Sequence, residues 1–512
     1  MGVKCGGAKH NCLFPKPPTL TPTSLLFKTL SPFVKWCKIT RSKRSEQLAE
    51  EGEGEEGHQL IIMDYSSSTS YRPHMILFPF MSKGHTIPML HLASLLLHRR
   101  IPVTFFTTPA NRPFISQYLA GSEASIVELP FPEQVAGVPA AVESTDKLPS
   151  MSLFSHLLKP QSFSNPTSNY SALKFGIPRL VFYCISSYAM TLSRLVYVNG
   201  LLIGPESDDE PFSVPEFPWI RLTKNDFEPS FGETSGAQTD FFMETAKSTS
   251  ESSGLVINSF CEIDSVFLDY WNRKFKDPKG WCIGPLCLVE PPRVELQPHE
   301  KPAWVEWLDL KLAQGNPVLY VAFGSQADIS AEQLQEIATG LEESKANFLW
   351  VKRQKESEIG DGFEERVKDR GIVVKEWVDQ RQILSHRSVQ GFLSHCGWNS
   401  VLESICAAVP ILAWPMMAEQ HLNARNVVEE MKVGLRVETT DGSVRGFVKK
   451  EGLEKMVKEL MEGDMGKQVR EKVKEVAEAA KTAMEEGGSS WQTLNVLIGE
   501  TCKKTSVGND VV

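Results

Sequence analysis

The sequence predicts an α/β protein built from two doubly wound domains. Two regions, 74–100 and 317–344, each begin with a short apolar strand, a turn containing glycine and a helical run. The stretch 281–304 between them is rich in proline and lacks periodicity, as an interdomain linker does. Because parallel strands need crossover helices, two such starts separated by a linker indicate two parallel sheets.

The composition is that of an ordinary globular protein. The 512 residues are 41% hydrophobic and 23% charged, and their net charge of −9 disfavours nucleic acid as a partner. No apolar run approaches the roughly 20 residues that a membrane-spanning helix needs. The ten cysteines are scattered without a C-x-x-C pair, which predicts reduced thiols and a cytoplasmic protein with neither a disulfide scaffold nor a zinc site.

Residues 1–70 are expected to lie outside the fold. They contain no acidic residue before Glu46, then the run EEGEGEE, and no sustained apolar periodicity. The basic start is faintly similar to a transit peptide. Two explanations stay open: a disordered extension, or an upstream region that is not translated in the native protein, for which Met63 is a natural start.

The first domain is expected to span 71–280. A buried strand at 74–80 leads through the turn 81–86, which holds His85, into a helix at 87–100, and the next strand follows at 102–108. Between Lys147 and Pro205 the chain contains neither Asp nor Glu.

The second domain is expected to span 305–489 and to contain a strand–helix–strand unit. Val389–Leu393 reads as a buried strand, Asn399–Ala408 as a helix and 411–414 as a second strand. Such a unit presents a helix N-terminus beside the carboxyl ends of parallel strands, where open α/β sheets bind phosphorylated ligands. A last helix, within 490–512, and a tail complete the chain.

The segment Trp377–Gln420 resembles the signature box of plant family 1 UDP-sugar glycosyltransferases. One departure is Asp379, where that family has proline. The resemblance implies the glycosyltransferase B fold, in which two Rossmann-like domains face a cleft and the last helix returns to the first domain. It rests on eleven positions at the family's spacing: Trp377, Gln380, His395, Gly397, Trp398, Asn399, Ser400, Glu403, Pro415, Glu419 and Gln420.

The same resemblance implies a binding site for UDP-glucose. The diphosphate would contact Ser325, His395, Asn399 and Ser400, with help from the helix dipole and without a metal or other cofactor. Trp377 would stack on uracil and Gln380 bond its edge. Glu403 would accept the two ribose hydroxyls, and Glu419 and Gln420 the sugar hydroxyls. The remaining donor-binding candidates are Val378, Gly397 and Trp398, the last of which also argues against a glucuronic acid donor.

Several of these residues have ordinary structural explanations. Ser400 and Glu403 fit the capping box S-x-x-E, in which the glutamate satisfies an amide of its own helix. Trp377 and Trp414 could be core aromatics, and His395 could be a structural histidine. Only the joint spacing favours the donor site.

His85 matches the family's catalytic base. A histidine suits this task because its ordinary pKa of about 6.5 lets it accept a hydroxyl proton near neutral pH. The family's partner aspartate is not found, and a strand–helix unit is missing near 155–172, a short, polar and turn-rich stretch. Three explanations stay open: an error in the assembled coding sequence, a protein without turnover, or another acid such as Asp146, provided that the chain bends back to His85.

The sequence therefore predicts an inverting glucosyltransferase. It would move glucose from UDP-glucose to a hydroxyl of a small phenolic plant metabolite, such as a flavonoid, and act as a monomer. The alternative is a nucleotide-sugar-binding protein that lacks the acid and does not turn over.

Overall fold

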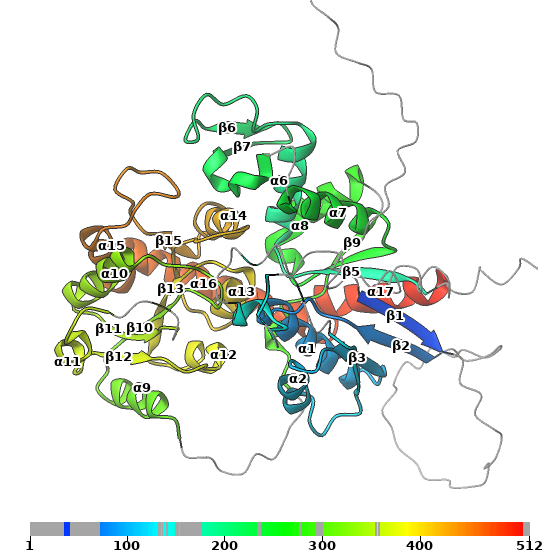
Figure 1. Cartoon of the computed structure of the whole chain (residues 1–512), viewed down its shortest axis with the longest axis horizontal. Helices are drawn as coiled ribbons and strands as arrows, with labels where there is room; N and C mark the ends of the chain where they lie inside the picture. The colour runs from blue at the N-terminus through cyan, green and yellow to red at the C-terminus, as the bar shows by residue number, and fades with distance from the viewer. Residues whose placement is uncertain are drawn as a thin grey trace, which may run out of the picture.

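The computed structural model contains two α/β domains that lie side by side (Figure 1). In Figure 1 the second domain, coloured from green through yellow to orange, lies on the left, and the first domain lies on the right with the red C-terminal helix against it. The structure describes residues 35–40, 72–131, 135, 137–139, 142–148, 153, 177–232, 237–275, 278–291, 301–353, 356 and 359–504.

The second domain is built on a six-stranded, wholly parallel sheet. Its strand order reverses between β10 and β13, and all residues of β10 are buried, as expected for a central strand covered on both faces. This reversal opens a crevice at the carboxyl ends of the two strands. In spatial order the strands are β12 (Gly371–Val374), β11 (Asn347–Val351), β10 (Val318–Ala322), β13 (Val389–Ser394), β14 (Ile411–Ala413) and β15 (Gly434–Arg436).

Helices with one apolar face cover this sheet. The Ser330 hydroxyl caps α10 by accepting the Gln333 N–H, and the buried side of α10 carries Leu334, Ile337 and Leu341. The helices are α9 (Ala303–Ala313), α10 (Ala331–Ser344), α11 (Phe363–Val367), α12 (Gln380–Leu384), α13 (Trp398–Cys406), α14 (Gln420–Arg425) with the π-helical turn Asn426–Glu430, α15 (Lys450–Glu462) and α16 (Asp464–Met484).

The first domain has a seven-stranded sheet in which one strand runs against the rest. β1 lies between β2 and β5 and pairs antiparallel with both, whereas the other strands are parallel. In spatial order the strands are β4 (Ser125–Glu128), β3 (Val103–Thr107), β2 (Arg72–Leu77), β1 (Lys35–Thr40), β5 (Arg179–Tyr183), β8 (Gly254–Ile257) and β9 (Gly280–Cys282).

The remaining elements of this domain surround the sheet and form its side of the cleft. The helices are α1 (Lys83–His98), α2 (Arg112–Tyr118), α6 (Ser187–Val198), α7 (Ala237–Ser250), α8 (Cys261–Lys274) and the returning α17 (Ser489–Lys504). A hairpin of β6 (Phe212–Val214) and β7 (Phe217–Leu222) and the short turns η1 (Thr145–Lys147), η3 (Lys224–Asp226), η4 (Pro229–Gly232) and η5 (Leu286–Leu288) complete it.

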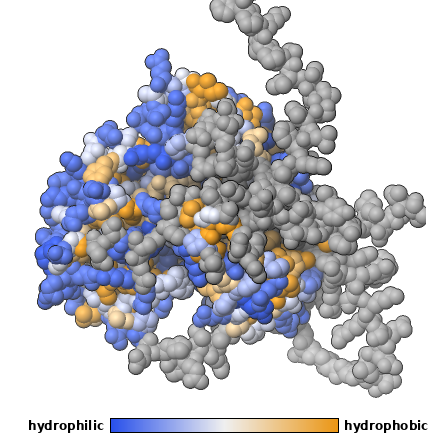
Figure 2. All heavy atoms as spheres, viewed as in Figure 1, coloured by the Kyte–Doolittle hydropathy of each residue, from blue (hydrophilic) through white to orange (hydrophobic). Residues whose placement is uncertain are grey.

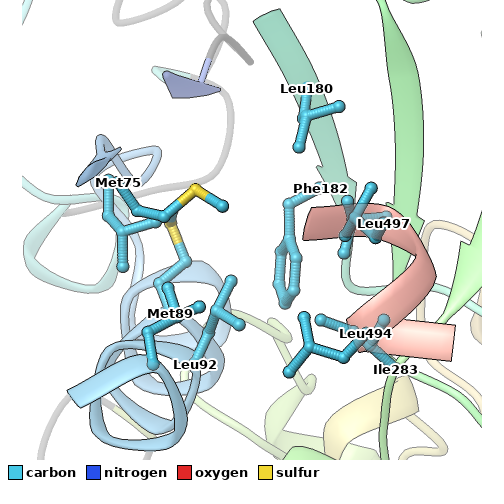
Figure 3. Close-up of a pocket in the computed structure, with 11 residues that line it drawn as sticks. Met75, Met89, Leu92, Leu180, Phe182, Ile283, Leu494 and Leu497 are labelled. Carbon is cyan, nitrogen blue, oxygen red and sulfur yellow. The ribbon is translucent and has the colours of Figure 1, made fainter. Parts of the chain in front are cut away.

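The last helix, α17, packs against the first domain. The Arg99 guanidinium donates to Asn495 Oδ1 at 2.6 Å, and Leu494 and Leu497 join the core. Figure 3 shows these two leucines across a space from Met89 of α1. The space has a volume of about 40 Å³, and every described side chain that lines it is apolar. So small an apolar space has no polar partners for water, so the core here is closed by α17 itself.

Three sequence expectations are corrected by these elements. Residues 35–40, placed outside the fold, form β1, and without them β2 and β5 would expose unpaired backbone groups in mid-sheet. The expected linker 281–304 overlaps β9, a strand too short for a periodic signal. Helix α1 begins at Lys83 rather than 87, so the turn that holds His85 is already helical.

The described surface is mainly polar. Figure 2 shows hydrophilic side chains over most of the outer face of the second domain. Among the described residues, no helix combines the length and apolarity needed to cross a bilayer.

Candidate active site

A cleft lies between the domains, where the carboxyl ends of β10 and β13 approach the turn before α1. His85 lines it from the first domain. From the second domain it is lined by all twelve residues that the sequence places at the donor: Ser325, Trp377, Val378, Gln380, His395, Gly397, Trp398, Asn399, Ser400, Glu403, Glu419 and Gln420.

His395 lies between two glycines at the end of β13. A Cβ at Gly324 or at Gly397 would come within 2.6 Å of His395 Nε2, so neither loop tolerates a side chain here. Gly324 also has a φ of +73°, which only glycine adopts easily. Burial lowers the pKa of His395 to about 4. The ring is therefore neutral at neutral pH and adds no charge to the cleft, and its one N–H can serve either the Ala322 carbonyl or a diphosphate.

Gln380, Ser400 and Glu403 form one hydrogen-bonded group. The Gln380 amide donates to Ser400 Oγ at 2.9 Å and to Glu403 Oε2 at 2.7 Å, and the Tyr320 hydroxyl donates to Gln380 Oε1 at 3.2 Å. Helix α13 is capped at Gly397 without a side-chain bond. The capping-box explanation for Ser400 and Glu403 is therefore wrong, because Glu403 bonds α12 rather than the start of its own helix.

Burial raises the pKa of Glu403 to about 7, against the opposing effect of the Gln380 hydrogen bond. A structural carboxylate would be expected to ionise well below neutral pH. A buried carboxyl whose hydrogen bonds come from one amide has acceptor capacity left for a ligand.

The two tryptophans that flank the box differ in environment. Trp414 is 6% exposed and packs edge-on to Phe323, so its core explanation is confirmed. Trp377 is 67% exposed and meets only the Phe114 edge of the first domain among the ring contacts described, with centroids 6.3 Å apart. The core explanation for Trp377 is wrong, and its exposed face can stack on a flat ligand. Val378, next to it, is buried.

The Trp398 side chain is buried and does not have the environment expected of a donor-binding residue. Its side chain is 1% exposed, and its indole N–H donates to the Asn258 carbonyl of the first domain at 2.8 Å. The polar group of Trp398 is therefore already used between the domains. This position favours packing over donor binding and removes the argument that Trp398 excludes a glucuronic acid donor.

Asn399 joins the start of α13 to the turn that holds His85. Its side-chain N–H donates to the Gly84 carbonyl at 2.6 Å, and Asn258 donates to Asn399 Oδ1 at 3.4 Å. Backbone amides at the N-terminus of α13 favour an anion. This end of α13 thus contacts Gly84, the residue that precedes His85.

The loop 416–420, termed here the sugar loop, contains Glu419 and Gln420. Gln420 Oε1 accepts the N–H groups of Met416 and Met417, each at 3.0 Å, which folds the loop back on its last residue. Burial raises the pKa of Glu419, and the nearby Glu228 adds to the shift.

His85 lies in the first turn of α1. Ser82 is the N-cap residue of this helix, and the His85 ring packs edge-on against Phe80 with centroids 5.5 Å apart. The side chain is partly buried and reaches the cleft. This is the place where an acceptor hydroxyl could approach from the first domain.

The structure describes one of the acidic residues that could partner His85. The stretch 155–172 lies outside the described residues. Asp146, however, lines the cleft, because η1 returns to the turn before α1: the Thr145 N–H donates to the Met81 carbonyl at 2.9 Å. Gln326 strengthens this return by donating to Thr145 Oγ1 at 2.6 Å. The chain thus bends back to the turn before α1, and in this arrangement the Ser144 hydroxyl donates to the Asp146 carboxylate.

The sequence did not predict two polar residues, Gln326 and Asn258, that position the site. Gln326 donates from the second domain to Thr145 and Ser82, and Asn258 holds both Trp398 and Asn399. Asn258 directly follows strand β8, and a polar residue at a strand's carboxyl end is the only signal that could have found it.

Asp379, the departure from the family pattern, starts helix α12. Its carboxylate accepts the Arg381 N–H at 3.0 Å as an N-cap. A side-chain cap therefore stands where the resemblance led us to expect a proline. Within the described part of the chain, no group of three or more His, Cys, Asp or Glu residues could hold a metal ion.

Known proteins are similar to this chain in both sequence and fold. UDP-glycosyltransferase 90A1 of Arabidopsis thaliana is 51% identical over 473 residues, which cover 85% of this chain and 98% of its own. The chain belongs to the plant family 1 UDP-glycosyltransferases. UDP-glycosyltransferase 90A2 of the same plant is 48% identical, over 84% and 98% of the two chains. The family model described as UDP-glucoronosyl and UDP-glucosyl transferase matches residues 298–476.

Solved structures of the family share the fold. UGT73P12 of Glycyrrhiza uralensis, complexed with glycyrrhetinic acid 3-O-monoglucuronide, has a TM-score of 0.73 at 28% identity, over 84% of this chain and 95% of its own. UGT2 of Phytolacca americana, complexed with UDP-2-fluoro-glucose and pterostilbene, has a TM-score of 0.66 at 29% identity, over 83% and 99%. The protein is therefore a UDP-glycosyltransferase of plant small molecules with the glycosyltransferase B fold.

Proposed function

We propose that this UDP-glycosyltransferase transfers glucose from UDP-glucose to a hydroxyl of a small phenolic acceptor, with inversion at the anomeric carbon. The observation that carries the proposal is the Asn399–Gly84 hydrogen bond of 2.6 Å. It sets the anion-binding end of α13 against the turn of His85. A base from one domain and a diphosphate site from the other can thus act on one sugar.

The reaction follows from this placement. His85 takes the proton of the acceptor hydroxyl while the oxygen attacks the anomeric carbon, and the bond from that carbon to the UDP oxygen breaks on the opposite side. The negative charge that grows on UDP meets N–H donors at Asn399, Ser400 and the neutral His395 ring. Attack opposite to departure inverts the anomeric centre.

The choice of glucose as the transferred sugar is based on Gln420, because the glucose-using members of the family that the sequence resembles have a glutamine at this position. A UDP-glucosyltransferase from Polygonum tinctorium that is capable of glucosylating indoxyl has a similar structure, with a TM-score of 0.67 at 28% identity over 83% of the present chain. The complex of the Phytolacca americana protein with pterostilbene supports a phenolic acceptor. Free thiols fit the cytoplasm, and six cysteines are free: Cys184, Cys261, Cys282, Cys287, Cys396 and Cys406.

The test measures UDP binding beside UDP release. Purified protein is given UDP-glucose, UDP-galactose or UDP-glucuronic acid with a panel of phenols, and release is followed with each. We expect release with UDP-glucose and at least one phenol. Tight UDP binding with no UDP release over the whole panel would instead establish the nucleotide-sugar-binding alternative. A preference for UDP-glucuronic acid would contradict the proposal that UDP-glucose is the donor.

The acid that orients His85 is proposed to be Asp146. A carboxylate beside the imidazole stabilises its protonated form, so Asp146→Asn should lower kcat by about 10- to 100-fold and shift the acidic limb of the rate profile to lower pH. Sequencing the native transcript across codons 150–175 gives the control. If it encodes a further strand with an aspartate, Asp146 is not the partner, and Asp146→Asn should leave the profile in place.

A further inference from the structure

A segment of the first domain is fastened to the second domain beside the sugar loop. The Arg425 guanidinium pairs with the buried Asp226 carboxylate at 2.6 Å. Arg445 donates to the carbonyls of Asn225 and Phe227 at 2.9 and 2.8 Å. Figure 1 shows α14, which carries Arg425, near α6 and the β6–β7 hairpin, and α14 also contacts η3. Residues 225–227 are thus held on the donor side of the cleft.

Glu228, the next residue, reaches the sugar loop itself. Its Oε1 accepts the Ala418 N–H at 2.8 Å and a second bond from Arg445 Nη2 at 3.2 Å. The Glu228 side chain is 31% exposed and lines the cleft. A partly buried, charge-assisted bond to a backbone amide is a stronger restraint than an exposed ion pair.

Ala418 needs such support because its backbone is strained. Its φ is +54°, in the left-handed region that a residue with a Cβ enters at a cost. The residues directly after it are Glu419 and Gln420. A change of the Ala418 conformation would therefore turn both side chains away from their present directions.

All three amides that lead into these residues are held by side-chain oxygens. Gln420 Oε1 holds Met416 and Met417 from within the loop, whereas Ala418 is held by Glu228 from the other domain. The third of these hydrogen bonds therefore forms only when the first domain contacts the loop.

We propose that Glu228 is a positioning residue for the transferred sugar: it holds the backbone of Ala418 so that Glu419 and Gln420 face the sugar of a UDP-sugar. The inference rests on the proposed function, in which those two residues contact the sugar. It adds a determinant of sugar recognition from the domain that otherwise holds the acceptor. The uridine and diphosphate contacts, at Gln380, Glu403 and Asn399, do not involve Glu228.

The experiment compares binding of UDP and of UDP-glucose, without acceptor, by titration calorimetry. It uses the full chain and its variants Glu228→Ala and Glu228→Gln. Losing one charge-assisted bond should weaken UDP-glucose binding about tenfold in Glu228→Ala, with UDP affinity kept within about twofold. Glu228→Gln keeps an oxygen that can accept the Ala418 N–H, so its loss should be smaller. Unchanged UDP binding also shows that each variant is folded.

Glu206→Ala is the matched control. Glu206 is an exposed carboxylate of the same domain and is remote from the sugar loop in the described contacts, so both affinities should stay as in the unaltered chain. Equal loss of UDP and UDP-glucose in Glu228→Ala, or no loss of either, would overturn the inference and mark Glu228 as a plain interdomain contact. If the unaltered chain binds neither compound, the proposed function itself fails.

Discussion

At the scale of single residues, burial changes the charge of two titratable side chains in the site. Burial keeps His395 neutral and holds Glu403 near its titration point, with pKa values of about 4 and about 7. A diphosphate in this cleft would meet N–H donors and a helix terminus beside cationic side chains such as Arg353.

His85→Ala should abolish most turnover while leaving UDP binding intact. The base contributes proton transfer, so the expected loss of kcat is about 10²- to 10⁴-fold. UDP affinity should not change, because the donor contacts come from the second domain. UDP-release rates and calorimetry measure the two quantities. His98→Ala, at the exposed end of the same helix, is the control, and equal losses in both variants would contradict the role of His85.

Glu403 should make UDP binding depend on pH around neutrality. Its pKa is raised to about 7 in the unliganded protein, so the carboxyl is mostly protonated near pH 6 and mostly ionised near pH 8. Only the carboxylate accepts both ribose hydroxyls strongly, so affinity should rise as pH rises through this window. Glu403→Gln should bind UDP more weakly at about pH 8 and lose this rise. A rise that persists in Glu403→Gln would place the titrating group elsewhere.

At the scale of elements, short helices and loops carry the site, and their ends are fixed by individual side chains. Helix α12 is only five residues long, yet it presents Gln380 to Glu403 because Asp379 caps it. Helix α13 starts at a glycine, which lets its first amides lie beside His395. Caps therefore matter more for this site than helix propensity does.

Asp379→Ala should cost about 1 kcal/mol of stability, since it removes the N-cap of α12. Asp379→Pro should cost less. The φ of Asp379 is −74°, within reach of the roughly −65° that proline imposes, and proline restricts the unfolded chain. Melting temperatures of both variants measure the difference. A proline variant that melts below the alanine variant would show that proline distorts the start of α12.

At the scale of the whole molecule, the first domain depends on a strand from a distant part of the chain. β1 lies between β2 and β5 and pairs with both. The two domains are then joined by contacts between residues far apart in sequence, such as Asp226 with Arg425 and Asn258 with Trp398. The cleft exists only once these long-range pairings have formed.

Two truncated chains test the role of β1. A chain that begins at Lys35 keeps the strand, and one that begins at Met63 lacks it. The second should melt at a lower temperature and bind a dye for exposed apolar surface, because β2 and β5 lose their shared partner. Equal melting temperatures would show that β1 contributes nothing to the stability of the sheet and that Met63 suffices as a start.

The sequence alone determined the family, the two α/β domains with their largely parallel sheets, and a set of residues that the structure brings together at one cleft. Strands such as β10 and β13 are continuous apolar runs, and the box has fixed spacing within one βαβ unit, so its geometry is local. The tertiary structure decided what depends on distant partners: the pairing of β1, the turn of Trp398 toward Asn258, the return of Asp146 and the hold of Glu228 on Ala418. A linear pattern records which face of an element is apolar, but it does not record which distant backbone atom a polar side chain will meet.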